Sequence, residues 1–281
     1  MTQPTGRPNR VLLINDMAGY GKVALSVMIP VFTHLKYETF NLPTALVSNT
    51  LDYGRFEILD TTAYMQGALK AWEELGFSFD VICTGFITSV KQAELVYRYG
   101  SAQRARGTRI FVDPILGDDG KLYNGVGPES VEAMRRLCSI GDVVMPNITE
   151  ACLLAGRTPQ PLYTQKDLEE ISESLHRLGA RALVLTSVPL QGRMVTAVKP
   201  SPSQPLELLP YEEIPVRFPG TGDIFMSLTA GRCLRTGRLT ESVRAAMTQV
   251  EALIRASLSS TDRYKGIPIE QLLEEIQDEE A

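Results

Sequence analysis

Short apolar runs alternate with amphipathic stretches along most of the chain. The apolar runs are rich in β-branched residues, as is typical of strands buried on both faces; they cover residues 10–16, 44–49, 79–85, 109–114, 141–147 and 181–187. Between these runs, apolar residues recur with helical spacing over 61–77, 90–105, 127–139 and 165–179. This alternation predicts an α/β sandwich in which parallel strands are joined by crossover helices.

The pattern changes after residue 187. Residues 193–218 contain five prolines and two alternating apolar runs, which predicts a small antiparallel excursion at the edge of the sheet. A well-patterned helix is predicted over 224–237. Because no stretch reads as a linker between domains, we expect one domain over 10–276, a flexible N-terminal tail over 1–9 and an acidic C-terminal tail over 277–281.

Composition excludes several classes of protein. With 281 residues and 44% hydrophobic content, the chain is long enough to bury a large core. A net charge of -5 argues against a nucleic-acid or membrane-surface binder, which needs a basic face. No segment has the apolar length of a membrane span, and the polar start lacks the core of a signal peptide. We therefore expect a soluble, cytoplasmic protein.

The cysteines and histidines do not suggest a disulfide framework, a zinc site or a catalytic triad. The four cysteines are scattered without a C-x-x-C pair, which predicts reduced thiols and neither a disulfide framework nor a zinc site. The two histidines, His34 and His176, lie in helix-like stretches, which disfavours a Ser/His triad.

Polar residues end five of the six predicted strands. In open parallel sheets, ligands bind outside the carboxyl ends of the strands, so we expect these residues to converge on one crevice. Capping of the following helices could explain some of these polar residues without any ligand, but it explains all five strand ends less well. The five ends are Asn15-Asp16, Thr84-Gly85, Asp113-Pro114, Pro146-Asn147 and Thr186-Ser187.

Residues 218–225, FPGTGDIF, place two glycines and a carboxylate at the start of a predicted helix. Glycine allows close backbone approach, and the first turn of a helix carries unpaired N–H groups at its positive end, so Gly220, Thr221 and Gly222 can hold an anion. The alternative is an ordinary loop in which Asp223 is an exposed carboxylate that favours the first turn electrostatically.

Two further motifs allow two interpretations each. Asn147 with Glu150 matches a capping box, which the spacing alone favours, but Glu150 could also face a metal-bound phosphate. Gly19 and Gly21 either allow a tight turn or let that turn approach a substrate. Neither glycine pair completes a G-x-G-x-x-G string and no P-loop occurs, which disfavours a nicotinamide dehydrogenase and a P-loop enzyme.

Taken together, these motifs resemble those of the ribokinase superfamily. The resemblance rests on Gly220-Thr221-Gly222-Asp223, on Asn147 with Glu150, and on Asp113-Pro114 with Gly117-Asp118. Within the superfamily the chain is similar, over nearly its whole length, to the pyridoxal (pyridoxine, pyridoxamine) kinase branch.

The resemblance implies a three-layer α/β/α fold with a mostly parallel sheet. It also implies ATP-dependent phosphorylation of the 5′-hydroxymethyl group of vitamin B6 vitamers, for the salvage of pyridoxal 5′-phosphate. ATP and Mg²⁺ are the implied cofactors, with room for a monovalent cation such as K⁺. The implied assembly is a homodimer formed through the edge of the sheet.

Site residues can be carried over from the same resemblance. Asp223 matches the catalytic base, and the amides of Gly220, Thr221 and Gly222 match an anion hole for the transferred phosphoryl group. Asp113 and Glu150 match positions that serve Mg²⁺ and ATP, whereas Asp118 and Tyr123 could equally be loop-surface residues. The full ATP set is Asp113, Asp118, Tyr123, Asn147, Glu150, Thr186 and Ser187, and the full substrate set is Asp16, Tyr20, Ser48, Asn49, Leu51, Phe86 and Asp223.

The chain departs from the family pattern on the substrate side. Asp16-Met17 stands where a Ser-His pair is common, Thr50-Leu51 where His-Thr is common, and Phe86 where tyrosine is frequent. An acidic Asp16 suits a protonated ring nitrogen or an amino substituent, so we hypothesise that pyridoxamine or pyridoxine is used at least as well as pyridoxal. Hydroxymethylpyrimidine kinase, which often has cysteine in place of Asp223, and a non-catalytic vitamer-binding protein are the alternatives.

Overall fold

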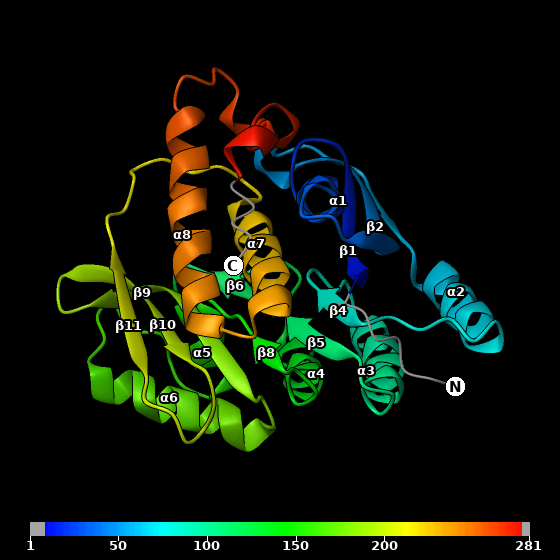
Figure 1. Ribbon diagram of the computed structural model, residues 1–281, viewed down its shortest axis with the longest axis horizontal. Helices are drawn as coiled ribbons and strands as arrows, with labels where there is room; N and C mark the ends of the chain where they lie inside the picture. Colours follow the sequence, from blue (N-terminus) through cyan, green and yellow to red (C-terminus); the bar gives the residue numbers. More distant parts are fainter. Residues whose placement is uncertain (1–8, 277–281) are drawn as a thin grey trace.

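A nine-stranded sheet forms the centre of the computed structural model, which describes residues 9–276 (Figure 1). Its strand order is β11-β10-β9-β8-β5-β4-β1-β2-β3. The strands are β1 Arg10–Tyr20, β2 Glu38–Asn49, β3 Ile58–Asp60, β4 Val81–Thr84, β5 Arg109–Val112, β8 Val143–Val144, β9 Ala182–Leu190, β10 Arg193–Lys199 and β11 Glu207–Tyr211. A separate hairpin pairs β6 Gly117–Asp118 with β7 Lys121–Leu122. Both predicted tails lie outside the described residues except for Asn9, whose amide donates to Asp80 Oδ2 at 2.9 Å.

The interior of the sheet is parallel and both of its edges are antiparallel. Strands β2, β1, β4, β5, β8 and β9 pair in parallel, whereas β10 and β11 at one edge and β3 at the other run antiparallel to their neighbours. The predicted α/β fold and the antiparallel excursion after residue 187 are therefore confirmed. Strand β3 follows from no pattern in the sequence.

Helices cover both faces of the sheet, which gives three layers (Figure 1). The helices are α1 Leu25–His34, α2 Thr62–Glu74, α3 Val90–Arg104, α4 Pro128–Cys138, α5 Ile148–Leu154, α6 Gln165–Leu178, α7 Thr221–Thr236 and α8 Leu239–Ala256. Side chains of α2 to α6 form one buried core with Leu12 and Ile14 of β1, and those of α1, α7 and α8 form the other with Val11 and Leu13. Alternate residues of one strand thus enter opposite cores, which explains why the strands are apolar throughout.

The four cysteines divide evenly between the two cores. Cys138 and Cys152 belong to the core under α2 to α6, and Cys83 and Cys233 belong to the core under α1, α7 and α8. All four are free and buried, and burial raises the pKa of each thiol. They are packing residues of the two cores.

Strand β1 extends four residues beyond its predicted end, to Tyr20. Its extension pairs with β2 as far as Tyr20 opposite Asn49, after a shift of register between Asn15 and Met17. This part of the strand, with alanine and glycine at its centre, gives no strand signal in the sequence, because long-range pairing and not local propensity holds it. Asp16 lies at the shift of register. Within residues 9–276, none of the helices combines the length and apolar content needed to cross a bilayer.

Candidate functional site

The carboxyl ends of β5, β8 and β9 open into a cavity of about 880 Å³. The first turn of α7 and the β6–β7 hairpin contribute to the same wall. The structure therefore brings both predicted nucleotide residues and predicted anion-hole residues into one place. They are Asp113, Asp118, Tyr123, Asn147, Glu150, Thr186, Ser187, Gly220, Thr221, Gly222 and Asp223.

Gly220 has a conformation and a neighbour that exclude a side chain. Its φ is 85°, and a Cβ atom there would lie 2.2 Å from the carbonyl oxygen of Lys22. Helix α7 begins at the next residue, and the amides of Thr221 and Gly222 donate to no described residue. A Cβ atom on Gly222 would meet nothing within 4 Å. The positive end of α7 thus faces open space in the cavity, a geometry suited to an anion.

Asp223 is held by two hydrogen bonds from the strand-1 region. Its Oδ2 accepts from the amide of Ala24 at 2.8 Å, and its Oδ1 accepts from Nδ2 of Asn15 at 3.0 Å. Burial raises the pKa of the Asp223 carboxyl, and these two bonds partly oppose the rise. Asp223 therefore does more than favour the first helical turn, because it also joins the start of α7 to Asn15 and Ala24.

Asn15 connects Asp223 to two further segments. Its Oδ1 accepts from the amides of Phe86, at 2.8 Å, and Asp16, at 3.0 Å, while its Nδ2 donates to Asp223. Gly85 makes this possible, because a Cβ atom there would overlap the Asn15 side chain at 2.3 Å. The sequence analysis places Asn15 at a strand end but not in the site. No local motif reveals a bond to a residue 208 positions away.

Asn147 and Glu150 form a capping box and also line the cavity. Asn147 Oδ1 accepts from the Glu150 amide at 3.0 Å, and Glu150 Oε2 accepts from the Asn147 amide at 2.9 Å. Glu150 Oε1 accepts from the amide of Leu116 at 3.1 Å, and Asn147 Nδ2 donates to the carbonyl of Gly117 at 2.8 Å. The cap therefore also holds the loop after β5 against α5. A capping role for Glu150 and a position that faces a metal-bound phosphate do not exclude each other.

Acidic groups crowd the floor of the site. Burial and the nearby Asp223 raise the pKa of Asp113 to about 8, and burial with Asp113 raises that of Glu150 well above its usual range. Asp113 accepts no hydrogen bond from any described residue. No group of three or more His, Cys, Asp or Glu side chains within residues 9–276 is arranged as a metal cluster. Two carboxylates nevertheless suit Mg²⁺, which takes one or two protein carboxylates and completes its shell with phosphate and water.

Asp16 is a further acidic group near Asp223. Burial, followed by the charge of Asp223, raises its pKa to about 7. A hydrogen bond from its own backbone amide opposes this rise, and its carboxylate makes no hydrogen bond or ion pair with any other residue of 9–276. A charge that is mostly removed from water without a partner is costly, and a bound cationic group would relieve that cost.

Of the predicted substrate residues, Asp223 lines the cavity, whereas Asp16 and the others do not. Ser48 Oγ donates to Asn49 Oδ1 at 2.7 Å, and Asn49 Nδ2 donates to the carbonyl of Arg55 at 2.9 Å, so both hold the β2–β3 connection. The ring of Tyr20 packs 6.0 Å from that of Tyr53. Leu51 is 48% exposed, and Phe86 is joined to the site through its backbone amide.

The Gly19–Gly21 turn is closely packed against protein. Gly21 has a φ of 122°, and a Cβ atom there would lie 2.3 Å from Cγ2 of Thr50. The next residue, Lys22, places its carbonyl oxygen against Gly220. Of the two interpretations left open, the described contacts favour a tight turn that supports the Gly220 loop.

Several residues that line the cavity follow from no sequence motif. They come from β10, β11, α7, α8 and the connection between β11 and α7. Their apolar side chains provide a surface for a flat ring. In the sequence they cannot be distinguished from the neighbouring apolar residues that pack in the core. They include Met194, Tyr211, Val216, Phe225, Met226 and Ile254.

Comparison with known proteins agrees with this geometry. The family model described as phosphomethylpyrimidine kinase matches residues 29–267. The pyridoxine/pyridoxal/pyridoxamine kinase of Bordetella pertussis is 31% identical over 272 residues, which cover 88% of this chain and 89% of the relative.

Two solved structures are similar along nearly the whole chain. A putative phosphomethylpyrimidine kinase from Bacteroides thetaiotaomicron, crystallised with pyridoxal, has a TM-score of 0.90 at 29% identity and covers 96% of each chain. A pyridoxal kinase from Lactobacillus plantarum has a TM-score of 0.86 at 29% identity and covers 95% of each chain. The chain therefore belongs to the phosphomethylpyrimidine kinase family, in the branch that contains the pyridoxal kinases, and is an ATP-dependent phosphotransferase with the ribokinase-like fold.

Proposed function

We propose that this kinase transfers the γ-phosphoryl group of ATP to the 5′-hydroxymethyl group of pyridoxal, pyridoxine and pyridoxamine. The observation that carries the proposal is the position of Asp223, a restrained carboxylate beside the unpaired amides of Thr221 and Gly222. Phosphoryl transfer needs an oriented hydroxyl and donors for the charge on the moving group, and this arrangement supplies both. The vitamin B6 kinases to which the chain is similar support the choice of acceptor.

In this proposal ATP occupies the 880 Å³ cavity. Asp113 and Glu150 would hold Mg²⁺, which neutralises charge on the β- and γ-phosphates when bound. Asn147 keeps Glu150 in place through the capping box, and Thr186 and Ser187, which lie within β9 and not at its end as predicted, line the cavity. Asp118 and Tyr123, on and beside the β6–β7 hairpin, line the same cavity.

Asp223 has two tasks in the reaction. Its Oδ atoms are fixed by Ala24 and Asn15, so the carboxylate can orient the acceptor hydroxyl. Because the transition state is loose, the proton leaves the hydroxyl late, and Asp223 receives it after bond formation has begun. The raised pKa of Asp223 favours this transfer, since burial makes the carboxylate more basic.

On the acceptor side, the vitamer ring would lie near β1 and β2. The proposed contacts are Asp16, Tyr20, Ser48, Asn49, Leu51 and Phe86. Among these, Asp16 is the charged residue, and its unpaired carboxylate favours a vitamer with a protonated ring nitrogen or an aminomethyl group. Pyridoxamine offers both.

The assembly, the location and the monovalent ion remain predictions. Exposed apolar side chains at the β2–β3 edge, among them Leu46, Ile58 and Leu59, support a homodimer through this edge of the sheet. We place the enzyme in the cytoplasm, where ATP is available, and include K⁺ as a candidate activator.

The description of the matching family favours one alternative acceptor, hydroxymethylpyrimidine, and a catalytically silent vitamer-binding protein is the other alternative. A coupled assay of ADP release with Mg-ATP separates these possibilities. The acceptors are pyridoxal, pyridoxine, pyridoxamine and hydroxymethylpyrimidine, each at saturating concentration. Turnover of hydroxymethylpyrimidine alone would replace the proposed acceptor, and no turnover of any compound would favour the silent protein.

The same assay on Asp223→Asn tests the role of the carboxylate. We expect kcat to fall by about 10³-fold because the amide can neither accept the proton nor orient the hydroxyl as an anion does. The melting temperature should change by only a few degrees, since loss of a buried charge offsets weaker bonds to Asn15 and Ala24. Retention of more than a tenth of parental kcat would contradict the assignment.

A further inference from the structure

Charge is distributed unevenly around the cavity. Among the described residues that line it, Arg217 is the only one with a basic side chain. The acidic residues on the same wall are Asp113, Asp118, Asp119, Glu150, Glu213 and Asp223. A polyphosphate that enters this acidic surface needs cations, and Mg²⁺ supplies only part of the charge.

Arg217 lies in the connection between β11 and α7, three residues before Gly220. The neighbouring Phe218 is 3% exposed, so the backbone is anchored in the core beside a side chain that remains 68% exposed. Burial is the main cause of the raised pKa of Tyr123, and the charge of Arg217 acts against it. The guanidinium is therefore within electrostatic reach of the Tyr123 side of the cavity.

The present partner of Arg217 is Asp52, and the contact is long. Arg217 Nε lies 4.0 Å from Asp52 Oδ1. Exposed pairs at such a distance contribute little to stability, so the guanidinium can leave Asp52 at low cost. Arginine also matches phosphate better than a single carboxylate oxygen, because its fork donates two parallel hydrogen bonds.

Asp52 belongs to the acceptor side of the molecule. It lies in a short 3₁₀ helix, Leu51–Tyr53, between β2 and β3. This segment is fastened to residues 262–264: Tyr53 OH donates to Asp262 Oδ2 at 2.5 Å, and Thr50 Oγ1 donates to the carbonyl of Tyr264 at 2.6 Å. The segment that carries Asp52 is therefore held in place beside Arg217, although Asp52 does not line the cavity. Arg217, in contrast, has an exposed side chain that can change its rotamer.

We propose that Arg217 exchanges Asp52 for the phosphates of ATP and is the basic side chain that binds them. This inference rests on the proposed function, since it requires a nucleotide in the cavity. Without nucleotide, Asp52 holds the guanidinium beside the cavity mouth. With nucleotide, the ion pair opens and Arg217 faces the phosphate chain next to the amides of the Gly220 loop.

The exchange predicts opposite effects for the two partners. Removal of the Arg217 charge should weaken nucleotide binding. Removal of the Asp52 charge should leave binding unchanged or strengthen it, because a competitor for the guanidinium is lost. If the pair were only a structural contact, both substitutions would disturb the site in the same direction.

The experiment is calorimetric titration of the full chain with the non-hydrolysable analogue AMP-PNP and Mg²⁺, combined with steady-state KM values. For Arg217→Gln we expect the Kd to rise about tenfold, the loss of one charge-assisted contact, with the KM for vitamer changed less than twofold. Arg217→Lys should lie between parent and Arg217→Gln. Asp52→Asn should show a Kd equal to or below that of the parent.

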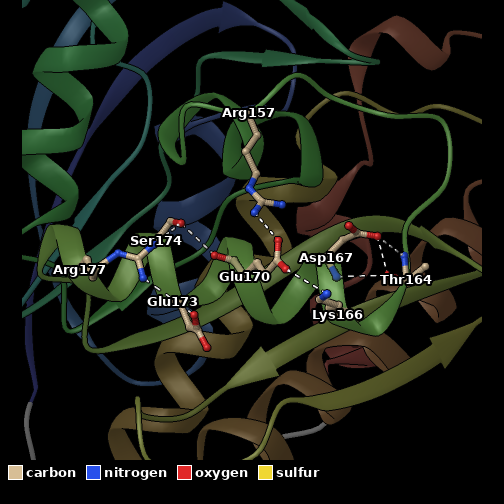
Figure 2. A network of polar contacts seen from close by, with 8 residues as sticks. All are labelled: Arg157, Thr164, Lys166, Asp167, Glu170, Glu173, Ser174 and Arg177. Atoms are coloured by element: carbon tan, nitrogen blue, oxygen red, sulfur yellow. Dashed lines mark hydrogen bonds and ion pairs between the residues drawn. The ribbon is translucent and has the colours of Figure 1, made fainter.

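Arg177→Gln is the matched control. Arg177 is 70% exposed and lies 3.9 Å from Glu173 Oε2 on α6, an exposed ion pair like that of Arg217 and Asp52 (Figure 2). It does not line the cavity. Its substitution should leave both Kd and KM unchanged.

Two outcomes would overturn the inference while the proposed function stands. One is an unchanged Kd for Arg217→Gln; the other is an equal weakening by Arg217→Gln and Asp52→Asn. Failure of the parent protein to bind Mg²⁺ with AMP-PNP is a distinct result, because it would overturn the proposed nucleotide site itself.

Discussion

The proposed nucleotide half and the proposed acceptor half of the site are built differently. The nucleotide half is a large cavity between strand ends, a capped helix and the start of α7. The proposed acceptor half lies around β1, β2 and the β2–β3 connection. There, the Ser48 side chain donates to Asn49, and the Asn49 side chain donates to the backbone. One half presents open space and unpaired donors; the other presents packed segments and one unpaired carboxylate, Asp16.

The two halves differ because they must recognise different parts of the substrates. A phosphate chain is common to all ATP-dependent enzymes of this fold, so the nucleotide half can be made from compact local motifs. The acceptor half must suit one small alcohol, and contacts between distant segments shape it. Specificity is therefore expected to depend on residues such as Asp16, while the chemistry depends on Asp223.

The largest effect is expected at Gly220, where the two halves touch. In Gly220→Ala, an alanine must adopt a φ of 85° and its Cβ must displace the carbonyl of Lys22, which is 2.2 Å away. We expect a loss of about 3 kcal/mol in the free energy of unfolding, and roughly 6–12 °C in melting temperature. Differential scanning calorimetry checks this value.

Gly222→Ala is the control for that substitution. A Cβ atom on Gly222 meets nothing within 4 Å, so this variant should fold with a melting temperature within about 2 °C of the parent. Equal destabilisation by the two substitutions would show that Gly220 is not a specific contact between the halves.

The second effect concerns pH and the unpaired Asp16. Its pKa is about 7 in the folded protein against 3.8 for an unperturbed aspartate. Between these values the folded state binds more protons than the unfolded state, so the free energy of unfolding falls as pH rises and levels off above pH 7. The full linkage for this shift would be about 4 kcal/mol. Because Asp16 is only partly buried, water screens part of the effect, and we expect a loss on the order of 2 kcal/mol from this residue.

Melting temperatures measured from pH 4 to pH 9 without nucleotide test this expectation. The variant Asp16→Asn should fall less steeply than the parent over the same range, because its amide does not titrate. A parental curve that is parallel to that of Asp16→Asn would show that Asp16 is ionised in the folded protein throughout.

The smallest effect concerns the choice of vitamer. Asp16→Asn should lower kcat/KM for pyridoxamine about tenfold more than for pyridoxal, since only the former brings an aminomethyl cation to the carboxylate. The measurement is kcat/KM for three vitamers at pH 8, where Asp16 is ionised. A uniform decrease for all three, or a strong preference of the parent for pyridoxal, would remove Asp16 from the determinants of specificity.

The sequence predicts those parts of the molecule that depend on local spacing. The capping box of Asn147 and Glu150 follows from residues three positions apart, and the turn before α7 follows from Gly220 and Gly222. The central strands follow from runs of apolar residues, because burial on both faces leaves a strong signal.

Long-range contacts leave no such signal. The bond between Asn15 and Asp223 joins residues 208 positions apart, and the contact between Arg217 and Asp52 joins two loops. The extension of β1 to Tyr20 depends on pairing with β2, which overrides the weak strand propensity of Gly19. Each of these features lies at the acceptor half or at its border, which explains why sequence analysis describes the nucleotide half better.

Because two buried cysteines lie in each core, the reactivity of the native thiols can report the unfolding of each core separately. Cys138 and Cys152 become reactive to alkylating reagents only when the layer of α2 to α6 opens, and Cys83 and Cys233 only when the layer of α1, α7 and α8 opens. Pulsed thiol labelling read by peptide mass spectrometry would therefore time the opening of each layer separately, with no engineered label. A layer that opens first would define the least stable cooperative unit of the fold.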